Sequence, residues 1–147
     1  MTKSFYIIIK APIERVFDAV DKEENIKKWM GGLLKTEYKS LKDAENPVGT
    51  KFLHKISGLA EIEGEVIAYQ KPVLLGVGQH YKNVSGTVFY HFKPLEDQST
   101  EIKCDLEVFE GSAVKTLLVK SLFPLFETLI QRQLDGIKAI AENEDNN

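Results

Sequence analysis

The sequence is poor in several residue types, and each shortage excludes a class of protein. Cys104 is the single cysteine among 147 residues, so the chain has no internal disulfide and no cysteine-based structural zinc site. Arginine is nearly missing, because only Arg15 and Arg132 contribute to the 19 basic residues. Arginine is the usual side chain for phosphate and guanine contacts, and the formal net charge is −3. We therefore expect no nucleic-acid partner.

Long apolar runs and targeting signals are also missing. No run is long enough to cross a membrane as a helix. The apolar run near the start ends at Lys10 and has no small-residue cleavage site, which predicts a cytoplasmic protein without a transmembrane segment. No linker, repeat or low-complexity tract divides the chain, so residues 1–147 are expected to form one domain. The spacing of the three histidines matches no metal motif, and we expect neither a metal nor a cofactor.

Hydrophobic periodicity divides the chain into helices and strands. Residues 4–10 are β-branched and aromatic, as is typical of a strand, and two short amphipathic helices follow before the Gly31-Gly32 pair. From about 33 to 109 the period is two and turn residues interrupt it, which predicts six strands in an antiparallel meander. After Gly111 a helical period returns and predicts a long terminal helix that Pro124 kinks or restarts.

The strand register follows from pairing like faces. A three-residue turn at 57–59 places His54 opposite Ile62 on one face and Lys55 opposite Glu61 on the other. The residues on the inner face and the opposite charges on the outer face therefore support the same register. The other pairings predicted in this way are Ile56–Ala60, Phe52–Gly64, Lys51–Glu65, Tyr69–Leu74, Val66–Val77, Lys82–Thr87, Gln79–Tyr90, Val77–Phe92, Tyr90–Cys104 and Phe92–Ile102.

This register gives the sheet one nearly continuous apolar face and one charged face. A sheet of this kind must cover its apolar face, and the long terminal helix is the only predicted element of matching size. We expect that helix to be buried against the sheet through Leu122, Leu125, Phe126, Leu129 and Ile130.

The order of these elements is the helix-grip order. Several short sequence segments also resemble the START-like (SRPBCC) superfamily, specifically its polyketide-cyclase-like branch. The matching segments are IIIKAPIERVFDAV, ENIKKWMGG, Val48-Gly49-Thr50, Gly64-Glu65-Val66, Lys71-Pro72 and PLFETLIQRQLDGIKAIAE. The chaperone-activator-like branch has a similar layout, but this chain lacks the double tryptophan often seen there after the second helix.

The resemblance implies an α+β helix-grip fold. This is a curved seven-stranded antiparallel sheet wrapped around a long C-terminal helix, with two short helices between strands 1 and 2. It also implies a deep hydrophobic cavity between sheet and helix, since members bind lipids, sterols, hormones, quinones or polyketides, and some catalyse cyclisation or hydrolysis. The superfamily shares no catalytic motif, so it assigns no catalytic residue to this chain.

A few polar and aromatic residues on the apolar face are candidates for chemistry. His54 is either a ligand hydrogen-bonder or general base, or a core histidine satisfied by a neighbouring group. Tyr90 either contacts a ligand or reaches water at the sheet edge. Trp29, beside the Gly31-Gly32 pair, is either part of a movable lid or a hydrophobic plug. Cys104 has no predicted cation beside it and is expected to be a core residue.

These observations predict a function in binding or carrying a small hydrophobic or aromatic ligand. The expected ligand-binding residues are Trp29, Phe52, His54, Ile62, Val66, Val77, Gln79, Tyr90, Phe92, Cys104, Phe126 and Ile130. One alternative is a polyketide cyclase/dehydratase- or hydrolase-type enzyme, with His54 as base and Tyr90 orienting a substrate oxygen. The other is a ligand-free protein-interaction module. The sequence leaves a homodimer open without indicating one.

Overall fold

The computed structural model describes residues 1–39, 45–58, 61–82, 84–109 and 113–143. The elements in chain order are β1 (Thr2–Ile9), α1 (Ile13–Asp21), α2 (Glu23–Trp29), β2 (Leu33–Tyr38), β3 (Lys51–Ile56), β4 (Ile62–Gln70), β5 (Leu74–Tyr81), β6 (Val84–Pro94), the 3-10 helix η1 (Glu96–Gln98), β7 (Thr100–Val108) and α3 (Ala113–Glu142). The predicted fold class is confirmed: a seven-stranded antiparallel sheet, two short helices after β1, and a long C-terminal helix.

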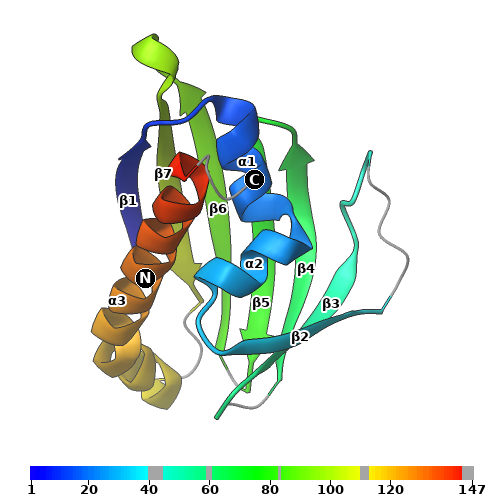
Figure 1. Ribbon diagram of the computed structural model, residues 1–147. Coiled ribbons are helices and arrows are strands. Elements are labelled where there is room, and N and C mark those ends of the chain that lie inside the picture. Colours follow the sequence, from blue (N-terminus) through cyan, green and yellow to red (C-terminus); the bar gives the residue numbers. More distant parts are fainter. Residues whose placement is uncertain (40–44, 59–60, 83, 110–112, 144–147) are drawn as a thin grey trace.

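The strands form a single sheet in the order β1-β7-β6-β5-β4-β3-β2 (Figure 1). Strands β2 to β7 are a meander, in which each strand pairs with the next along the chain. The first strand joins the far edge by pairing with the last, so that Phe5 lies opposite Cys104. All three helices lie on one side of this sheet, with α3 in front of β1 and β7 and α1 in front of the central strands (Figure 1).

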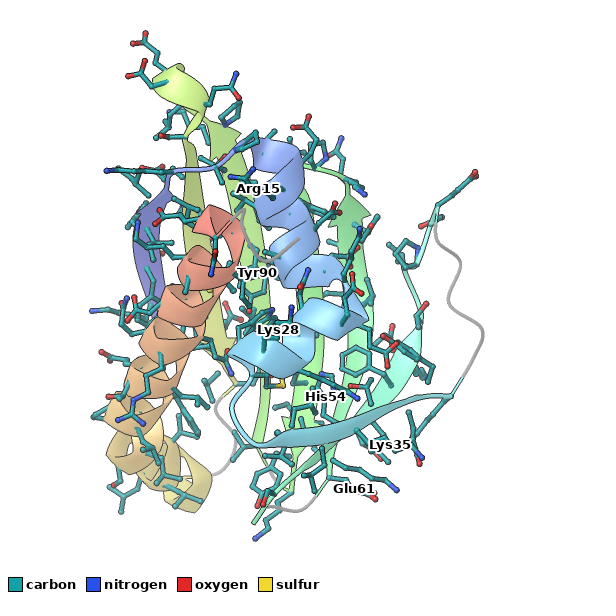
Figure 2. The ribbon with its side chains drawn as sticks, in the orientation of Figure 1. Arg15, Lys28, Lys35, His54, Glu61 and Tyr90 are labelled. Carbon is teal, nitrogen blue, oxygen red and sulfur yellow. The ribbon has the colours of Figure 1, made fainter. Side chains whose placement is uncertain are left out.

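The predicted β3–β4 register is confirmed where the structure describes it. His54 pairs with Ile62, and Phe52 pairs with Gly64. Lys55 Nζ lies 3.7 Å from Glu61 Oε1, as the charged face predicts. The Ile56–Ala60 pair and the end of its turn lie outside the described residues. Figure 2 shows Glu61 at the outer rim of the molecule.

The β6–β7 register is also confirmed, because Tyr90 pairs with Cys104 and Phe92 with Ile102. Together with the β3–β4 pairs, this means that the sequence pattern assigns the faces of both ends of the meander correctly.

The predicted β4–β5 register is wrong in part. Val66 pairs with Val77 as expected, but the extra residue of a β-bulge then shifts the ladder, and Tyr69 pairs with Leu75 instead of Leu74. A bulge of this kind leaves no clear mark in an alternating pattern.

The β5–β6 register is displaced by four residues from the prediction. Tyr81 pairs with Val84 and Val77 pairs with Val88, so the Lys82–Thr87, Gln79–Tyr90 and Val77–Phe92 pairs are not formed. The predicted Lys82–Thr87 pair would leave residues 83–86 as a turn, but of these the structure assigns 84–86 to β6, and residue 83 lies outside the described residues. Because the displacement is an even number, every side chain keeps its predicted face.

Helix α3 buries a different stripe from the one predicted. Leu125 is 64% exposed and Leu129 is 49% exposed, so their expected burial is wrong. Leu122 and Phe126 are half-buried, and only Ile130 of the expected set is buried. The buried stripe consists of Val119, Phe123, Ile130, Leu134, Ile137 and Ala141. The physical reason is that α1 and α2 share the cover of the sheet, while α3 lies toward β1 and β7 (Figure 1). Leu125 and Leu129 are therefore left exposed.

Pro124 does not divide α3, which runs as a single helix from Ala113 to Glu142, so the expected restart is absent. Thr128 Oγ1 donates a hydrogen bond to the Pro124 carbonyl at 3.0 Å. In the part of the chain that the structure describes, no helix is long and apolar enough to span a membrane.

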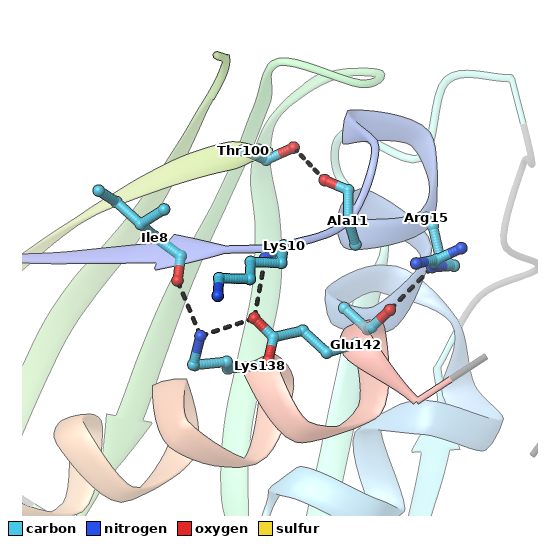
Figure 3. A network of polar contacts seen from close by, with 8 residues as sticks. Ile8, Lys10, Ala11, Arg15, Thr100, Lys138 and Glu142 are labelled. Atoms are coloured by element: carbon cyan, nitrogen blue, oxygen red, sulfur yellow. Dashed lines mark hydrogen bonds and ion pairs between the residues drawn. The ribbon is translucent and has the colours of Figure 1, made fainter. Parts of the chain in front are cut away.

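The C-terminal end of α3 is tied to the start of the chain by polar contacts (Figure 3). Arg15 Nε donates to the Ala141 carbonyl at 2.8 Å. The Glu142 carboxylate accepts hydrogen bonds from the Lys10 backbone N–H at 2.8 Å and from Lys138 Nζ at 2.6 Å. The Arg15 contact pairs a carbonyl that a helix end leaves unpaired, and together the three contacts fix this half of α3 against β1 and α1.

Candidate functional site: a cavity between the sheet and the helices

A cavity of about 200 Å³ lies between the inner face of the sheet and the helices. Its floor comes from β2 to β6, and its cover comes from the end of α1, from α2 and the residues after it, and from the middle of α3. The lining residues are Val20, Asp21, Ile26, Trp29, Met30, Gly31, Tyr38, Phe52, His54, Ile56, Ile62, Val66, Leu75, Val77, Gln79, Val88, Tyr90, Leu129, Ile130 and Gln133.

Most of the residues expected to bind a ligand line this cavity. They are Trp29, Phe52, His54, Ile62, Val66, Val77, Gln79, Tyr90 and Ile130. Phe92, Cys104 and Phe126 do not line it. The ring of Phe92 instead packs against Phe17 of α1, with 5.0 Å between ring centroids. Cys104 is fully buried in β7, where burial raises the pKa of its thiol to about 12.

His54 is a buried histidine with one ring nitrogen paired. Its Nδ1 lies 2.9 Å from Thr36 Oγ1 on β2, and its ring packs on Phe52 at 4.6 Å between centroids. Burial lowers the pKa of His54 to about 4, so the ring is neutral at neutral pH. Among the described residues, Nε2 has no hydrogen-bond partner, yet it is not sealed from solvent. Nδ1 is therefore paired within the core, and Nε2 is available to a molecule in the cavity.

Tyr90 supplies the second open polar group. It lies on β6 in the middle of the sheet, between Leu75 on β5 and Cys104 on β7, and not at an edge. Burial raises the pKa of its phenol well above the usual value, so the hydroxyl stays protonated. Within the described residues the hydroxyl has no hydrogen-bond partner and is not sealed from solvent. A phenol in this setting can donate to an oxygen of a bound molecule.

Three polar lining residues were not predicted: Asp21, Tyr38 and Gln133. Asp21 Oδ2 accepts a hydrogen bond from the Tyr69 hydroxyl at 2.8 Å. Burial, followed by the charges of Glu23 and Asp21, raises the pKa of Tyr38. The sequence carried a signal for Tyr38, because it shares a strand face with Thr36 two residues earlier. Asp21 and Gln133 reach the cavity only because α1 and α3 end up beside it.

Trp29 connects all three helices. Its Nε1 donates to the Ala19 carbonyl of α1 at 2.9 Å. A Cβ added at Gly136 of α3 would lie 3.0 Å from Trp29 Cβ, so the two helices are in close contact there. A side chain anchored on both sides favours the plug over the movable lid.

The remaining histidines lie on the outer face, as the register predicts. His80 Nδ1 lies 2.6 Å from Ser85 Oγ, and His91 Nε2 lies 3.2 Å from Asp105 Oδ2. Over the described ranges, no group of His, Cys, Asp and Glu side chains is arranged to hold a metal ion.

Comparison with known proteins assigns the chain to a family. A family model described as polyketide cyclase / dehydrase and lipid transport matches residues 3–142. The chain belongs to this family. This confirms the resemblance to the polyketide-cyclase-like branch that the short sequence segments indicate. No curated protein shows a significant sequence match to the chain.

Several solved structures share the family fold. A conserved protein from Geobacillus kaustophilus has a TM-score of 0.74 at 17% identity, covering 96% of this chain and 95% of that one. A hypothetical protein from Helicobacter pylori also has a TM-score of 0.74, at 15% identity, covering 96% and 88%. The di-domain ARO/CYC protein StfQ of the steffimycin biosynthetic pathway has a TM-score of 0.73 at 18% identity, covering 98% of this chain and 46% of StfQ. At these identities the likeness establishes the fold alone.

Proposed function

We propose that the protein binds or carries a small hydrophobic or aromatic ligand in the cavity between its sheet and helices. The observation that carries this proposal is an apolar cavity containing two buried polar groups without a protein partner among the described residues, His54 Nε2 and the Tyr90 hydroxyl. Small-molecule sites typically have this composition, mostly apolar with a few convergent polar groups. The family description, which includes lipid transport, supports the same conclusion.

The size of the cavity limits the ligand. Its volume of about 200 Å³ exceeds the roughly 150 Å³ of an apolar cavity that accepts benzene and falls below the roughly 300 Å³ at which drug-sized pockets begin. The enclosed part of the ligand is therefore about one or two rings, or a short aliphatic chain. A larger ligand would extend through the opening.

The charges at the site favour a neutral ligand. The described lining contains the carboxylate of Asp21 and no lysine or arginine. An anionic group bound inside would be desolvated without a cation to pair with it, which is costly. A neutral ligand with a hydroxyl or carbonyl group can instead bond to Tyr90 or to His54 Nε2. These bonds would discriminate between ligands more than they would add affinity.

One observation favours a second candidate, an enzyme of the cyclase, dehydratase or hydrolase type. His54 is neutral, and its Nε2 has no protein partner among the described residues, so it has the form of a general base. Its pKa of about 4 makes it a weak one, suited to removing only a fairly acidic proton. The ligand-free interaction module has less support, because side chains do not fill the space between sheet and helices.

Binding is tested with N-phenyl-1-naphthylamine, a neutral apolar fluorophore. We expect it to bind the wild type with a blue-shifted emission. Val77→Trp, which fills the cavity from β5, should weaken this binding. Ile67→Trp is the matched control, since Ile67 lies on the outer face of neighbouring β4 and is partly exposed. Equal binding by both folded variants would show that the apolar face is core and not a binding site.

Carriage and catalysis are separated by native mass spectrometry of protein purified from its natural host. A retained molecule whose mass stays constant during incubation supports carriage. A change in that mass which is absent in His54→Leu supports the enzyme, provided that His54→Leu still retains the molecule.

A further inference from the structure

The polar and apolar residues beneath the cavity follow one another in order along the strands. Residues that pair between neighbouring strands form rows across the sheet. Successive rows on one face are two residues apart on β5 and β6, which is about 7 Å along a strand. Three such rows cross the inner face. They are Phe52–Gly64–Gln79–Gly86, then Val66–Val77–Val88, then Tyr69–Leu75–Tyr90.

The middle row is wholly apolar. Val66, Val77 and Val88 pair directly across β4, β5 and β6, and all three line the cavity. Their side chains have no hydrogen-bonding atom, so a polar group placed over them would lose its water without gaining a partner. We therefore expect the middle of a bound molecule to be apolar.

One polar end of the cavity lies beyond the first row. His54 is two residues past Phe52 on β3, and its pairing with Ile62 places it on the side away from the valines. Gln79 of the first row and Tyr38, which pairs with Phe52, also line this end. The group that this end offers to a ligand is His54 Nε2, which has no partner among the described residues.

The other polar end lies at the third row, which contains Tyr90 and its open hydroxyl. In the same row, the Tyr69 hydroxyl donates to Asp21 Oδ2 at 2.8 Å, so the carboxylate of the described lining also belongs to this end. Tyr90 is four residues, or about 13 Å, along β6 from Gly86 of the first row, and His54 lies beyond that row. Figure 2 shows the two residues apart, with His54 near β2 and Tyr90 nearer α1.

We propose that the cavity holds an elongated, neutral molecule with an apolar middle and a hydrogen-bonding oxygen at each end, one bonded to Tyr90 and the other to His54 Nε2. This rests on the proposed function and narrows its ligand to a two-ended class. A molecule with an oxygen at one end only would leave the protein group at the other end unpaired against an apolar surface, which is unfavourable. A hydroxyl suits both ends because it can donate and accept.

The test compares two-ring ligands that differ in where their hydroxyls lie, using isothermal titration calorimetry. 4,4′-Dihydroxybiphenyl has one hydroxyl at each end, 3,5-dihydroxybiphenyl has both on one ring, and 4-phenylphenol has a single terminal hydroxyl. We expect 4,4′-dihydroxybiphenyl to bind about fivefold or more tightly than either of the others, which is the effect of one additional hydrogen bond.

Variants at the two ends test whether both groups produce this preference. Tyr90→Phe removes the hydroxyl and keeps the ring, so the preference for 4,4′-dihydroxybiphenyl should disappear. 4-Phenylphenol should lose less affinity, because it can turn round and bond to His54. His54→Leu removes the other end and should cancel the preference in the same way. The matched control is Tyr6→Phe, since Tyr6 of β1 is 61% exposed and does not line the cavity. It should keep the preference of the wild type.

Three results would overturn the proposal. They are equal affinities of the wild type for the two dihydroxybiphenyls, a preference that survives Tyr90→Phe or folded His54→Leu, and no binding of any of the three ligands. Binding of N-phenyl-1-naphthylamine reports on the proposed function separately. If this fluorophore binds while 4,4′-dihydroxybiphenyl shows no advantage, the cavity binds apolar molecules without recognising two ends. If neither binds, the proposed function fails as well.

Discussion

Thr36 and His54 lie directly opposite each other on β2 and β3, with 2.9 Å between the threonine Oγ1 and the imidazole Nδ1. Both side chains are buried. The pair anchors the imidazole on the protein side, so that its second nitrogen keeps a fixed direction. The neutral ring at this position makes stability depend on pH.

The pH dependence has a definite sign. Burial lowers the pKa of folded His54 from 6.5 to about 4, so between these values the unfolded chain binds a proton that the folded protein does not. The contribution of His54 to the free energy of unfolding is therefore fully present above pH 6.5, the pKa of the unfolded chain. As the pH falls from there toward the folded pKa of about 4, the free energy of unfolding decreases by up to about 1.4 kcal/mol per pH unit. We expect His54→Gln to flatten this slope in urea unfolding between those pH values.

The control for this measurement is His80→Gln, an exposed histidine on the outer face. It should keep the slope of the wild type. If the pH profiles of wild type and His54→Gln ran parallel, burial of a neutral imidazole would not be the cause.

The two leucines of α3 at positions 134 and 129 should respond differently to truncation. Leu134 is 0% exposed, whereas Leu129 is 49% exposed. Leu134→Ala should lower the free energy of unfolding by about 2–5 kcal/mol, as cavity-forming substitutions do. Leu129→Ala should cost about 0.5 kcal/mol or less but weaken binding of N-phenyl-1-naphthylamine. Denaturant melts of both variants check this, and a larger loss for Leu129→Ala would show that its exposure is misassigned.

Gly64 makes room for the floor of the cavity. A Cβ at this position would overlap the ring of Phe52, its partner on β3. Gly64→Ala should therefore displace that ring, costing about 1–3 kcal/mol as overpacking does, and change the affinity for the fluorophore. Gly78→Ala is the matched control on β5, where the nearest atom, Ile67 Cγ2, would be 3.6 Å away. Similar effects of the two substitutions would point to a general loss of strand flexibility instead.

The contact of Glu142 with the start of the chain should also depend on pH. The Lys10 backbone N–H, followed by Lys138, lowers the pKa of the Glu142 carboxyl. A lowered carboxyl pKa contributes stability that is present above the unfolded value and is lost as the pH falls through the folded one. Glu142→Gln should cost less than about 1 kcal/mol at neutral pH, and the difference should vanish in acid. Glu96→Gln, in the exposed η1, should show neither effect.

The sequence by itself determined which side of the sheet most strand residues face, except beyond the β-bulge in β4, where a one-residue shift brings Tyr69 to the inner face. Strand side chains alternate with period two, so the inner position of Val77 and Gln79 survived a register error of four residues. The opposite charges of Lys55 and Glu61 reinforced the β3–β4 register, which the structure reproduces. The order of elements was also legible, because turn residues and changes of period mark their ends.

Only the tertiary structure decided what covers that inner face, and where. A helical pattern says that α3 has an apolar side, but Leu129 and Leu134 are equally apolar in the sequence. Which of the two is buried depends on how α1, α2 and α3 divide the inner face of the sheet among them. For the same reason Phe92 and Cys104, on the correct face, lie beneath α1 or within the core, while Asp21 and Gln133 reach the cavity from the helices. The side of the sheet that a strand residue faces depends on its local sequence, whereas the position of a cavity depends on contacts between segments far apart in sequence.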